Sequence, residues 1–276
     1  MASHESSAAG YDGISGFGAL YDAVPLYQQR PDVGFYIVEA SDVTKSRPRA
    51  PILEIGSGTG RVLLPLARAG YAVTGIEQSN EMLRRCLERV AAEPPEVRAR
   101  VRLEHADART LDIGGEFALA IAPFRVFQHF LTIDDQVNAL ASIRRHLAPH
   151  GRLVFDVFNP NYMLMTKDRS AETEDAPETQ IEDGRWMRRT SRVIKVHAVQ
   201  QVSDVELTYY LRTGGSTKRL VHSFQMRWYT PAEVQHLLAR GGFRVEHMYG
   251  GWDRAPLGDE SPEIIVRASP TAEAAR

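Results

Sequence analysis

The feature that most constrains the fold is an apolar segment that runs directly into three alternating glycines. Residues 52–60 read Ile-Leu-Glu-Ile-Gly-Ser-Gly-Thr-Gly, and a helical pattern over Val62–Ala69 follows at once. Glycines at this spacing allow a tight turn and bring backbone N–H groups close to a ligand, where a side chain would collide. A strand, a glycine turn and a helix in this order predict the first βα unit of a nucleotide-binding α/β fold.

Short apolar runs alternate with helical periodicity from Pro51 to Phe158, which is typical of βαβ units around a parallel sheet. The predicted strands are Ile52–Ile55, Ala72–Glu77, Val101–His105, Phe117–Ala122 and Arg152–Val157. The predicted helices are Val62–Ala69, Ser79–Ala91 and Asp134–Leu147. The parallel pattern resumes with Phe243–Tyr249, and Glu263–Arg267 is the last strand. We therefore expect a doubly wound α/β fold with a mostly parallel, seven-stranded sheet.

The segment between these two stretches follows another pattern. Ser170–Gly184 is acidic and poor in large apolar residues, which predicts a mobile loop. Alternation with a period of two residues follows, in three runs that include Val205–Leu211 and Leu220–Trp228, and predicts an inserted antiparallel β-sheet. Thr230-Pro231-Ala232-Glu233 then combines a capping residue, a proline and an acid, so a helix should run to about Arg240.

The chain therefore divides into three parts. Residues 1–50 form an N-terminal helical segment on the side where a second substrate, the acceptor, would bind. Residues 51–160 and 230–268 form the cofactor-binding α/β domain. Residues 161–229 form the inserted loop and antiparallel sheet, which we interpret as a lid or a dimer surface. Within it, Trp228 and Tyr229 are expected to pack in a core.

Three acids accompany the glycine turn. Glu77 ends the second predicted strand 21 positions after Gly56, about where a ribose-binding carboxylate lies in a nucleotide-binding βαβ unit. Glu54 lies two residues before Gly56, and Asp107 follows the third strand. Carboxylates attract a sulfonium and an ammonium but repel a pyrophosphate. Because Arg61 also stands where the dinucleotide fingerprint has its third glycine, the pattern favours a cationic amino-acid nucleoside over NAD or FAD.

These residues resemble the class I S-adenosylmethionine-dependent methyltransferases, over about Tyr21 to Arg267. In that family an acid-x-G-x-G-x-G segment and acids after the second and third strands all bind S-adenosyl-L-methionine. The resemblance implies that Glu54 and the glycine turn hold the methionine end, Glu77 the ribose, and Asp107 the adenine edge. The residues expected to bind the cofactor are Glu54, Gly56, Ser57, Gly58, Gly60, Glu77, Gln78, Met82, Asp107, Ala108, Pro123 and Phe124.

The segment after the fourth strand, Ala122–Phe130, lies at the edge of the sheet where this fold binds ligands. Its His129 can accept a proton or orient an acceptor, because an imidazole titrates near neutral pH. Together with Tyr11 and Tyr21, the segment resembles the deoxyaminosugar N,N-dimethyltransferases, and small-amine methyltransferases similar to glycine N-methyltransferase are a nearby precedent. The resemblance implies catalytic roles for His129 and for Tyr11 or Tyr21. Arg125 replaces a small residue of that family, which leaves the sugar open.

Composition limits the partners. The chain has 33 Lys and Arg against 35 Asp and Glu, and a net charge of −2 gives no general attraction to nucleic acid or to an anionic membrane. We therefore expect a small-molecule methyl acceptor, no nucleic-acid partner and no membrane partner. Cys86 is the only cysteine, and the histidines are scattered, so no disulfide within the chain and no metal site are expected. Met1–Gly10 lacks the pattern of a secretion signal, so we expect a cytoplasmic location.

The expected activity is the transfer of a methyl group from S-adenosylmethionine to a nitrogen or oxygen of a small molecule by in-line displacement. Two alternatives stay open at this point. One is a nicotinamide-dependent oxidoreductase with Glu77 on the adenosine ribose, and the other is a non-catalytic S-adenosylmethionine-binding regulatory module. The sequence does not identify the acceptor, the number of methyl transfers or the oligomeric state, although a homodimer would suit the inserted sheet.

Overall fold

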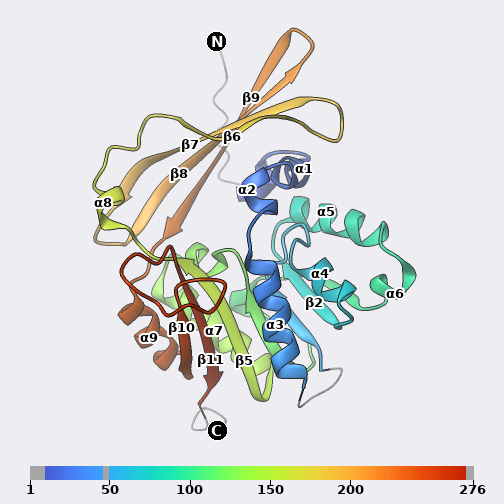
Figure 1. Ribbon diagram of the computed structural model, residues 1–276, viewed down its shortest axis with the longest axis vertical. Helices are drawn as coiled ribbons and strands as arrows, with labels where there is room; N and C mark the ends of the chain where they lie inside the picture. The colour runs from blue at the N-terminus through green and yellow to red at the C-terminus, as the bar shows by residue number, and fades with distance from the viewer. Residues whose placement is uncertain (1–9, 46–49, 272–276) are drawn as a thin grey trace.

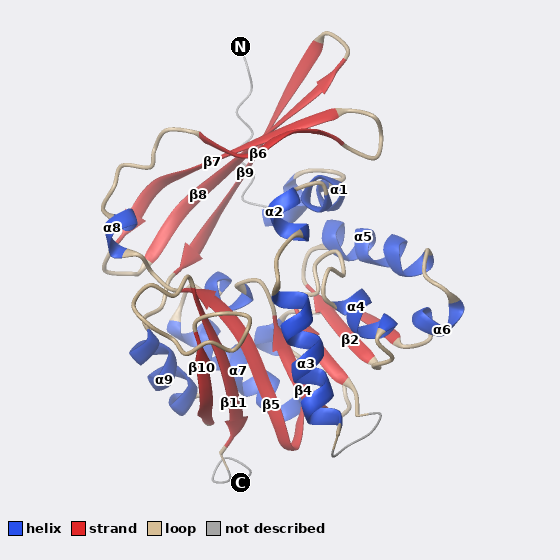
Figure 2. Ribbon diagram, in the orientation of Figure 1, coloured by secondary structure: helices blue, strands red, loops and turns tan. Residues whose placement is uncertain are grey.

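The computed structural model describes residues 10–45 and 50–271 (Figure 1). A seven-stranded sheet with helices on both faces forms one part of the molecule, and a separate four-stranded sheet lies beyond one end of it (Figure 2). The expected absence of a secretion signal concerns Met1–Gly10, of which only Gly10 is among the described residues.

The large sheet contains β1 (Ile52–Ile55), β2 (Val73–Glu77), β3 (Val101–His105), β4 (Phe117–Ala122), β5 (Leu147–Phe158), β10 (Phe243–Tyr249) and β11 (Glu263–Pro270). Their order across the sheet is β3-β2-β1-β4-β5-β11-β10. Strands β1 to β5 are parallel, which confirms the expected mostly parallel sheet. The order reverses between β1 and β4, and ligands of this fold bind at such a switch point.

Strand β10, expected to resume the parallel pattern at Phe243, runs in the same direction as β1 to β5 but does not pair with them. Strand β11 lies between β5 and β10 and is antiparallel to both. A turn-containing loop joins β10 to β11 with no helix, so the two strands can only pair antiparallel. Both strands were thus located correctly by their apolar pattern, and only β11 runs against the parallel strands.

Helices cover the large sheet through two apolar clusters. On one face, α3 (Asp32–Thr44) and α4 (Leu63–Arg68) pack against the sheet. On the other face, α7 (Ile133–His146) and α9 (Pro231–Arg240) do so. The hydroxyl of Thr230 accepts a hydrogen bond from the Glu233 N–H and Pro231 opens the helix, which confirms the expected start of α9. The helices α5 (Asn80–Ala91) and α6 (Pro95–Arg98) connect β2 to β3.

The inserted sheet contains β6 (Thr173–Gln180), β7 (Trp186–His197), β8 (Val202–Thr213) and β9 (Ser216–Arg227). Its strands pair antiparallel in sequence order, which confirms the expected inserted antiparallel sheet. The short helix α8 (Tyr162–Met165) precedes it. The prediction that Ser170–Gly184 forms a mobile loop was wrong, because most of that segment is the edge strand β6.

Arginines on the neighbouring strands explain why the acidic segment pairs. Both carboxylate oxygens of Asp175 accept from the buried Arg189 of β7, at 2.9 and 3.0 Å. Glu178 binds Arg212 of β8 in the same two-pronged way. The acids therefore form cross-strand ion pairs, and their partners cannot be identified from the sequence of the acidic segment alone.

The N-terminal helices share a core with the inserted sheet. Apolar residues of α1 (Phe17–Asp22) pack with Met82 of α5 and with inward-facing residues of β7 and β8. Short helix α2 (Pro25–Gln28) follows α1 in the same region (Figure 1). The N-terminal segment is thus held between the two sheets, above the carboxyl edge of the large one.

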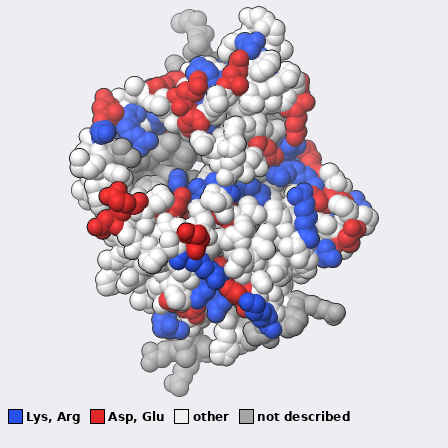
Figure 3. Space-filling model, viewed as in Figure 1, with Lys and Arg blue, Asp and Glu red and all other residues white. Residues whose placement is uncertain are grey.

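The surface carries charges of both signs. Lys and Arg side chains are interspersed with Asp and Glu side chains on the face shown in Figure 3. Among the described residues, no helix is long and apolar enough to cross a membrane.

Candidate active site

A cavity of about 550 Å³ lies at the carboxyl ends of β1, β2 and β4. The N-terminal segment and strand β9 of the inserted sheet complete its walls. It brings together all three expected catalytic residues, His129, Tyr11 and Tyr21. Of the residues expected to bind the cofactor, the cavity is lined by Glu54, Gly56, Ser57, Gly58, Glu77, Gln78, Met82, Asp107, Ala108, Pro123 and Phe124.

The three glycines of the turn have different surroundings. All three have positive φ, at 66° for Gly56, 55° for Gly58 and 84° for Gly60, a region that residues with a Cβ rarely adopt. A Cβ on Gly56 would lie 2.8 Å from Val126, so this glycine lets the segment after β4 approach the turn. A Cβ on Gly60 would lie 2.9 Å from Cys86, so Gly60 serves packing and does not line the cavity. Gly58 faces the open space.

Glu54 is a buried carboxyl group at the cavity wall. Its side chain is 2% exposed, and Oε2 has no hydrogen-bond partner within the described part of the chain. Burial raises the pKa of Glu54 well above its usual range, and the nearby Arg61 only partly opposes this. The Arg61 guanidinium is itself committed to Asp32 through two hydrogen bonds of 2.6 Å. Glu54 therefore lacks a cationic partner, which a ligand in the cavity would supply.

Glu77 ties the end of β2 to the glycine turn. Its carboxylate accepts backbone hydrogen bonds from Gly58 at 2.8 Å, Gln78 at 2.9 Å and Ser79 at 2.8 Å. Burial raises the pKa of Glu77, although these three hydrogen bonds act in the opposite direction. Two carboxylate oxygens have about four lone-pair sites, so at least one remains for a ligand hydroxyl.

Asp107 follows β3 and caps η2 (Ala108–Thr110). Its side chain forms a salt bridge with Arg109, which also contacts Asp135 of α7. The hydrogen bonds from Arg109 lower the pKa of Asp107. The carboxylate at this end of the cavity is therefore ionised and held in one orientation.

The segment after β4 begins with a strained turn. Phe124 and Arg125 have φ of 59° and 68°, a region that costs a residue with a Cβ about 1–2 kcal/mol. Asp156 of β5, which is fully buried, fixes this turn by accepting hydrogen bonds from the Phe124 N–H at 2.7 Å and the Tyr36 hydroxyl at 2.8 Å. Desolvation raises the pKa of Asp156 to about 6. Backbone strain is thus held at the cavity edge by a buried carboxyl group.

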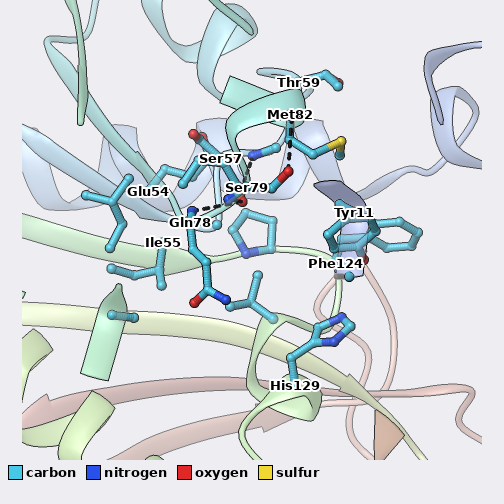
Figure 4. Close-up of a pocket in the computed structure, with 18 of the residues that line it drawn as sticks. Tyr11, Glu54, Ile55, Ser57, Thr59, Gln78, Ser79, Met82, Phe124 and His129 are labelled. Carbon is cyan, nitrogen blue, oxygen red and sulfur yellow. Dashed lines mark hydrogen bonds between the residues drawn. The ribbon is translucent and has the colours of Figure 1, made fainter. Parts of the chain in front are cut away.

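The short helix η3 (Val126–His129) presents His129 to the cavity (Figure 4). Gln128 fixes the helix on one side, since it donates to the Arg227 carbonyl at 2.6 Å and accepts from the Phe158 N–H at 3.0 Å. The Tyr229 hydroxyl fixes the other side by bonding to two carbonyl groups of this segment. Sequence reasoning missed both anchors, although Gln128 adjoins the predicted histidine and Tyr229 was placed only in a core.

His129 lines the cavity and is an exposed residue. Desolvation lowers the pKa of His129 to about 4, so the imidazole is neutral at pH 7. Tyr11, in η1 (Gly10–Gly13), lies with its ring centre 6.3 Å from that of His129. Burial raises the pKa of both Tyr11 and Tyr21, so both phenols are neutral donors. The side chains of Tyr11, Tyr21 and His129 therefore give the acceptor side an aromatic wall whose own groups are uncharged.

Asp12 holds the N-terminal segment over the cofactor side. Its carboxylate accepts from the Ser79 hydroxyl at 2.7 Å and the Glu81 N–H at 3.0 Å, both at the start of α5. Ser79 in turn caps α5 and follows Glu77 by two residues. The wall that carries Tyr11 is thus anchored to the strand end that carries Glu77.

Comparison with known proteins agrees with this geometry. A family model described as a methyltransferase domain matches residues 52–151. The dTDP-3-amino-3,4,6-trideoxy-alpha-D-glucopyranose N,N-dimethyltransferase of Streptomyces venezuelae is 24% identical over 224 residues, 78% of this chain and 86% of that protein. The dTDP-3-amino-3,6-dideoxy-alpha-D-glucopyranose N,N-dimethyltransferase of Streptomyces fradiae is 25% identical over 264 residues, 90% and 92% of the two chains. The CcbJ methyltransferase of Streptomyces caelestis superposes with a TM-score of 0.75 at 22% identity, over 95% and 99% of the two chains.

The chain is an S-adenosylmethionine-dependent methyltransferase with the α/β fold of such enzymes. The oxidoreductase and the non-catalytic module are thereby set aside in favour of an enzyme that uses S-adenosylmethionine. The cavity of this methyltransferase fits that cofactor in two independent ways. The unpartnered carboxyl of Glu54 suits the ammonium of the methionine end, and the space over Gly58 is one that a side chain would fill.

In the described ranges, no group of three or more His, Cys, Asp or Glu residues could hold a metal ion. Metal-independent transfer stays a prediction.

Proposed function

We propose that this methyltransferase transfers the methyl group of S-adenosylmethionine to the amine nitrogen of a small molecule. The observation that carries the proposal is the continuity of one cavity, which joins Glu54 and the glycine turn to the uncharged aromatic wall around His129. Glu54 and the glycine turn would hold the cofactor at the first end, and the acceptor would bind at the second.

The low pKa of His129 favours nitrogen over oxygen as the atom that is methylated. A neutral amine has a free lone pair and attacks without a base, whereas a hydroxyl must first lose its proton. A histidine with a pKa of about 4 is a weak base at pH 7 but still accepts a hydrogen bond. His129 therefore orients an amine better than it deprotonates a hydroxyl.

The bound cofactor supplies an electrophilic methyl group on a sulfonium, and the chain supplies position. Glu54 and the backbone around Gly58 hold the methionine end, and Glu77 accepts from the ribose. Tyr11, Tyr21 and His129 hold the acceptor in line. Correct placement of two reactants alone contributes about 7–11 kcal/mol in ideal cases.

An amino sugar is the first acceptor to test. Two relatives are named as N,N-dimethyltransferases of dTDP-linked amino sugars. Aromatic side chains such as Tyr11, Phe124 and Phe224 line the acceptor side, and aromatic faces attract a protonated or methylated amine. The same proposal includes the roles given to the site residues and the division of the chain into three parts. It also includes the inserted sheet as a lid or dimer surface, a cytoplasmic location and the lack of a nucleic-acid partner.

The test is incubation with S-adenosylmethionine and a panel of amines, followed by mass spectrometry. The panel contains the two dTDP-amino sugars named above, benzylamine, glycine, and the matched hydroxyl compounds benzyl alcohol and glycolate. We expect one or two methyl groups on an amine and none on its hydroxyl counterpart. Methylation of the hydroxyl compounds alone would overturn the assignment to nitrogen.

A further inference from the structure

His222 is a second histidine at the acceptor wall, contributed by strand β9 of the inserted sheet. The residue as a whole is 1% exposed, and its ring stacks on two aromatic residues. The centre of the imidazole lies 4.9 Å from the ring centre of Tyr11 and 5.2 Å from that of Phe224, with interplanar angles of 23° and 24°. Phe17 is a third aromatic neighbour, at 4.8 Å, so aromatic contacts hold the imidazole in place.

The two ring nitrogens of His222 have unequal surroundings. One ring nitrogen hydrogen-bonds to the backbone of Gly10, an interaction that favours the protonated ring. The other, Nε2, is buried and has no hydrogen-bond partner among residues 10–45 and 50–271. Nδ1 therefore carries the hydrogen, and Nε2 is left as an acceptor.

Desolvation lowers the pKa of His222 to about 4, so this arrangement persists at neutral pH. A buried acceptor without a donor is unfavourable, and native proteins satisfy most such atoms. The described chain offers no donor, and the neighbouring open space is the acceptor side of the cavity. Because His222 lines this cavity, a molecule that fills it is the candidate source of the missing donor.

We propose that His222 is an acceptor-binding residue, whose Nε2 accepts a hydrogen bond from an N–H or O–H group of the methyl acceptor. The proposal rests on the proposed function, since it assumes that the acceptor occupies this wall. It makes the inserted sheet part of the acceptor site. His222 then selects for acceptors that carry a donor on the side facing β9.

Two substitutions separate hydrogen bonding from packing. His222→Phe keeps an aromatic ring between Tyr11 and Phe224 but has no acceptor atom. His222→Gln loses the ring but can place an acceptor oxygen near the position of Nε2. His236→Gln, on the exposed side of α9, is the matched control. The probe is the panel amine that the wild-type protein methylates fastest.

We expect His222→Phe to raise the KM for the amine on the order of 10- to 100-fold, while His222→Gln stays within about 5-fold of wild type. The affinity for S-adenosylhomocysteine should stay unchanged in both. A packing role predicts the reverse order, with His222→Phe close to wild type and His222→Gln impaired, and that order would overturn the proposal. A wild-type protein that methylates no amine overturns the proposed function and the inference with it.

A second measurement is needed if one of the variants does not fold. Loss of S-adenosylhomocysteine binding would reveal such a variant. Nitrogen-15 spectra of the histidines in the wild-type protein report the unprotonated Nε2 of His222, identified by its absence from the spectrum of whichever His222 variant folds. Addition of the amine to the S-adenosylhomocysteine complex should shift this resonance. A shift of His129 alone, with His222 unmoved, would contradict the proposal.

Discussion

The two ends of the cavity are built in different ways. Most of the cofactor end is formed by segments that lie close in sequence, from Glu54 to Ala108, at or near the ends of β1, β2 and β3. The acceptor end combines Tyr11, His129 and His222, which come from three distant segments. A site made of consecutive turns is encoded locally, whereas a site made of distant side chains depends on the complete fold.

The anchors of the two ends differ as well. At the cofactor end, Glu77 accepts three backbone N–H groups within its own βαβ unit. At the acceptor end, Gln128 and Tyr229 hold η3 through contacts with residues about 30 and 100 positions away, and Asp156 holds the strained turn. The first end should therefore tolerate changes elsewhere in the chain better than the second.

The largest effect is expected from Gly58→Val. A branched side chain would fill the space over the turn, so binding of S-adenosylhomocysteine should fall below detection, by more than about 100-fold. Isothermal titration measures the affinity, and thermal melting reports folding. Gly214→Val is the matched control, because Gly214 has nearly the same φ of 56° and nothing within 4 Å of its Cβ position. Equal affinity in the two variants would remove Gly58 from the cofactor site.

The cofactor end could be predicted because its sequence signals lie close together in the chain. Glycine spacing and an acid at the end of β2 specify a turn and a partner group within some twenty residues, so periodicity and spacing were enough. The placement of Gly60 was beyond this reasoning, because the close approach of the glycine turn to Cys86 of α5 depends on how that helix packs. All other residues expected at the cofactor line the cavity, although their individual roles remain predictions.

The next largest effect is expected from His129→Ala. Loss of the group that orients the acceptor should lower the single-turnover rate on the order of 10²-fold, the scale of a reactant misplaced by about 1 Å, with unchanged affinity for S-adenosylhomocysteine. His129→Gln should keep most of the activity, because the pKa of about 4 makes the imidazole an orienting group more than a base. His236→Ala is the control. Near-normal turnover in a folded His129→Ala protein would move the catalytic assignment to Tyr11 and Tyr21.

The acceptor end was only partly predictable. His129 was found through its place after the fourth strand, which is a local signal. His222 was not, because alternation in β9 shows only that it shares a face with Phe224, and its unpartnered nitrogen becomes visible only when the N-terminal segment is packed against the sheet. Strand β6 was missed likewise, since its acids pair with arginines such as Arg189 on another strand.

A smaller effect is expected from Glu77→Ala. Loss of a charged hydrogen-bond acceptor should weaken S-adenosylhomocysteine binding by about 1.5–3 kcal/mol, without altering the KM for the amine. Glu77→Gln keeps one acceptor oxygen and should lie between the alanine variant and wild type. Titration of the nucleoside and steady-state kinetics on the amine distinguish the two ends. A raised KM for the amine with unchanged nucleoside affinity would place Glu77 outside the cofactor end.

The smallest effect concerns the protonation of Glu54. Its pKa is raised by burial, so the free protein holds a proton there at pH values where an ordinary glutamate is ionised. The ammonium of the ligand favours the carboxylate, so binding should release this proton. Affinity for S-adenosylhomocysteine should then rise with pH, at most about tenfold per unit, and level off once the pH passes the raised pKa.

Titration calorimetry in buffers of different ionisation enthalpy, between about pH 5 and pH 8, measures the released proton directly. Asp156 also titrates in this range, with its pKa raised to about 6, but it does not line the cavity. Glu54→Gln separates the two groups, because it keeps Asp156 and the shape of the wall while removing the titrating carboxyl. The affinity of the variant for S-adenosylhomocysteine should not rise with pH, and the variant should release fewer protons on binding than the wild type. Equal proton release by both proteins would show that Glu54 does not meet the ammonium, and the acid before the glycine turn would then serve the protein core alone.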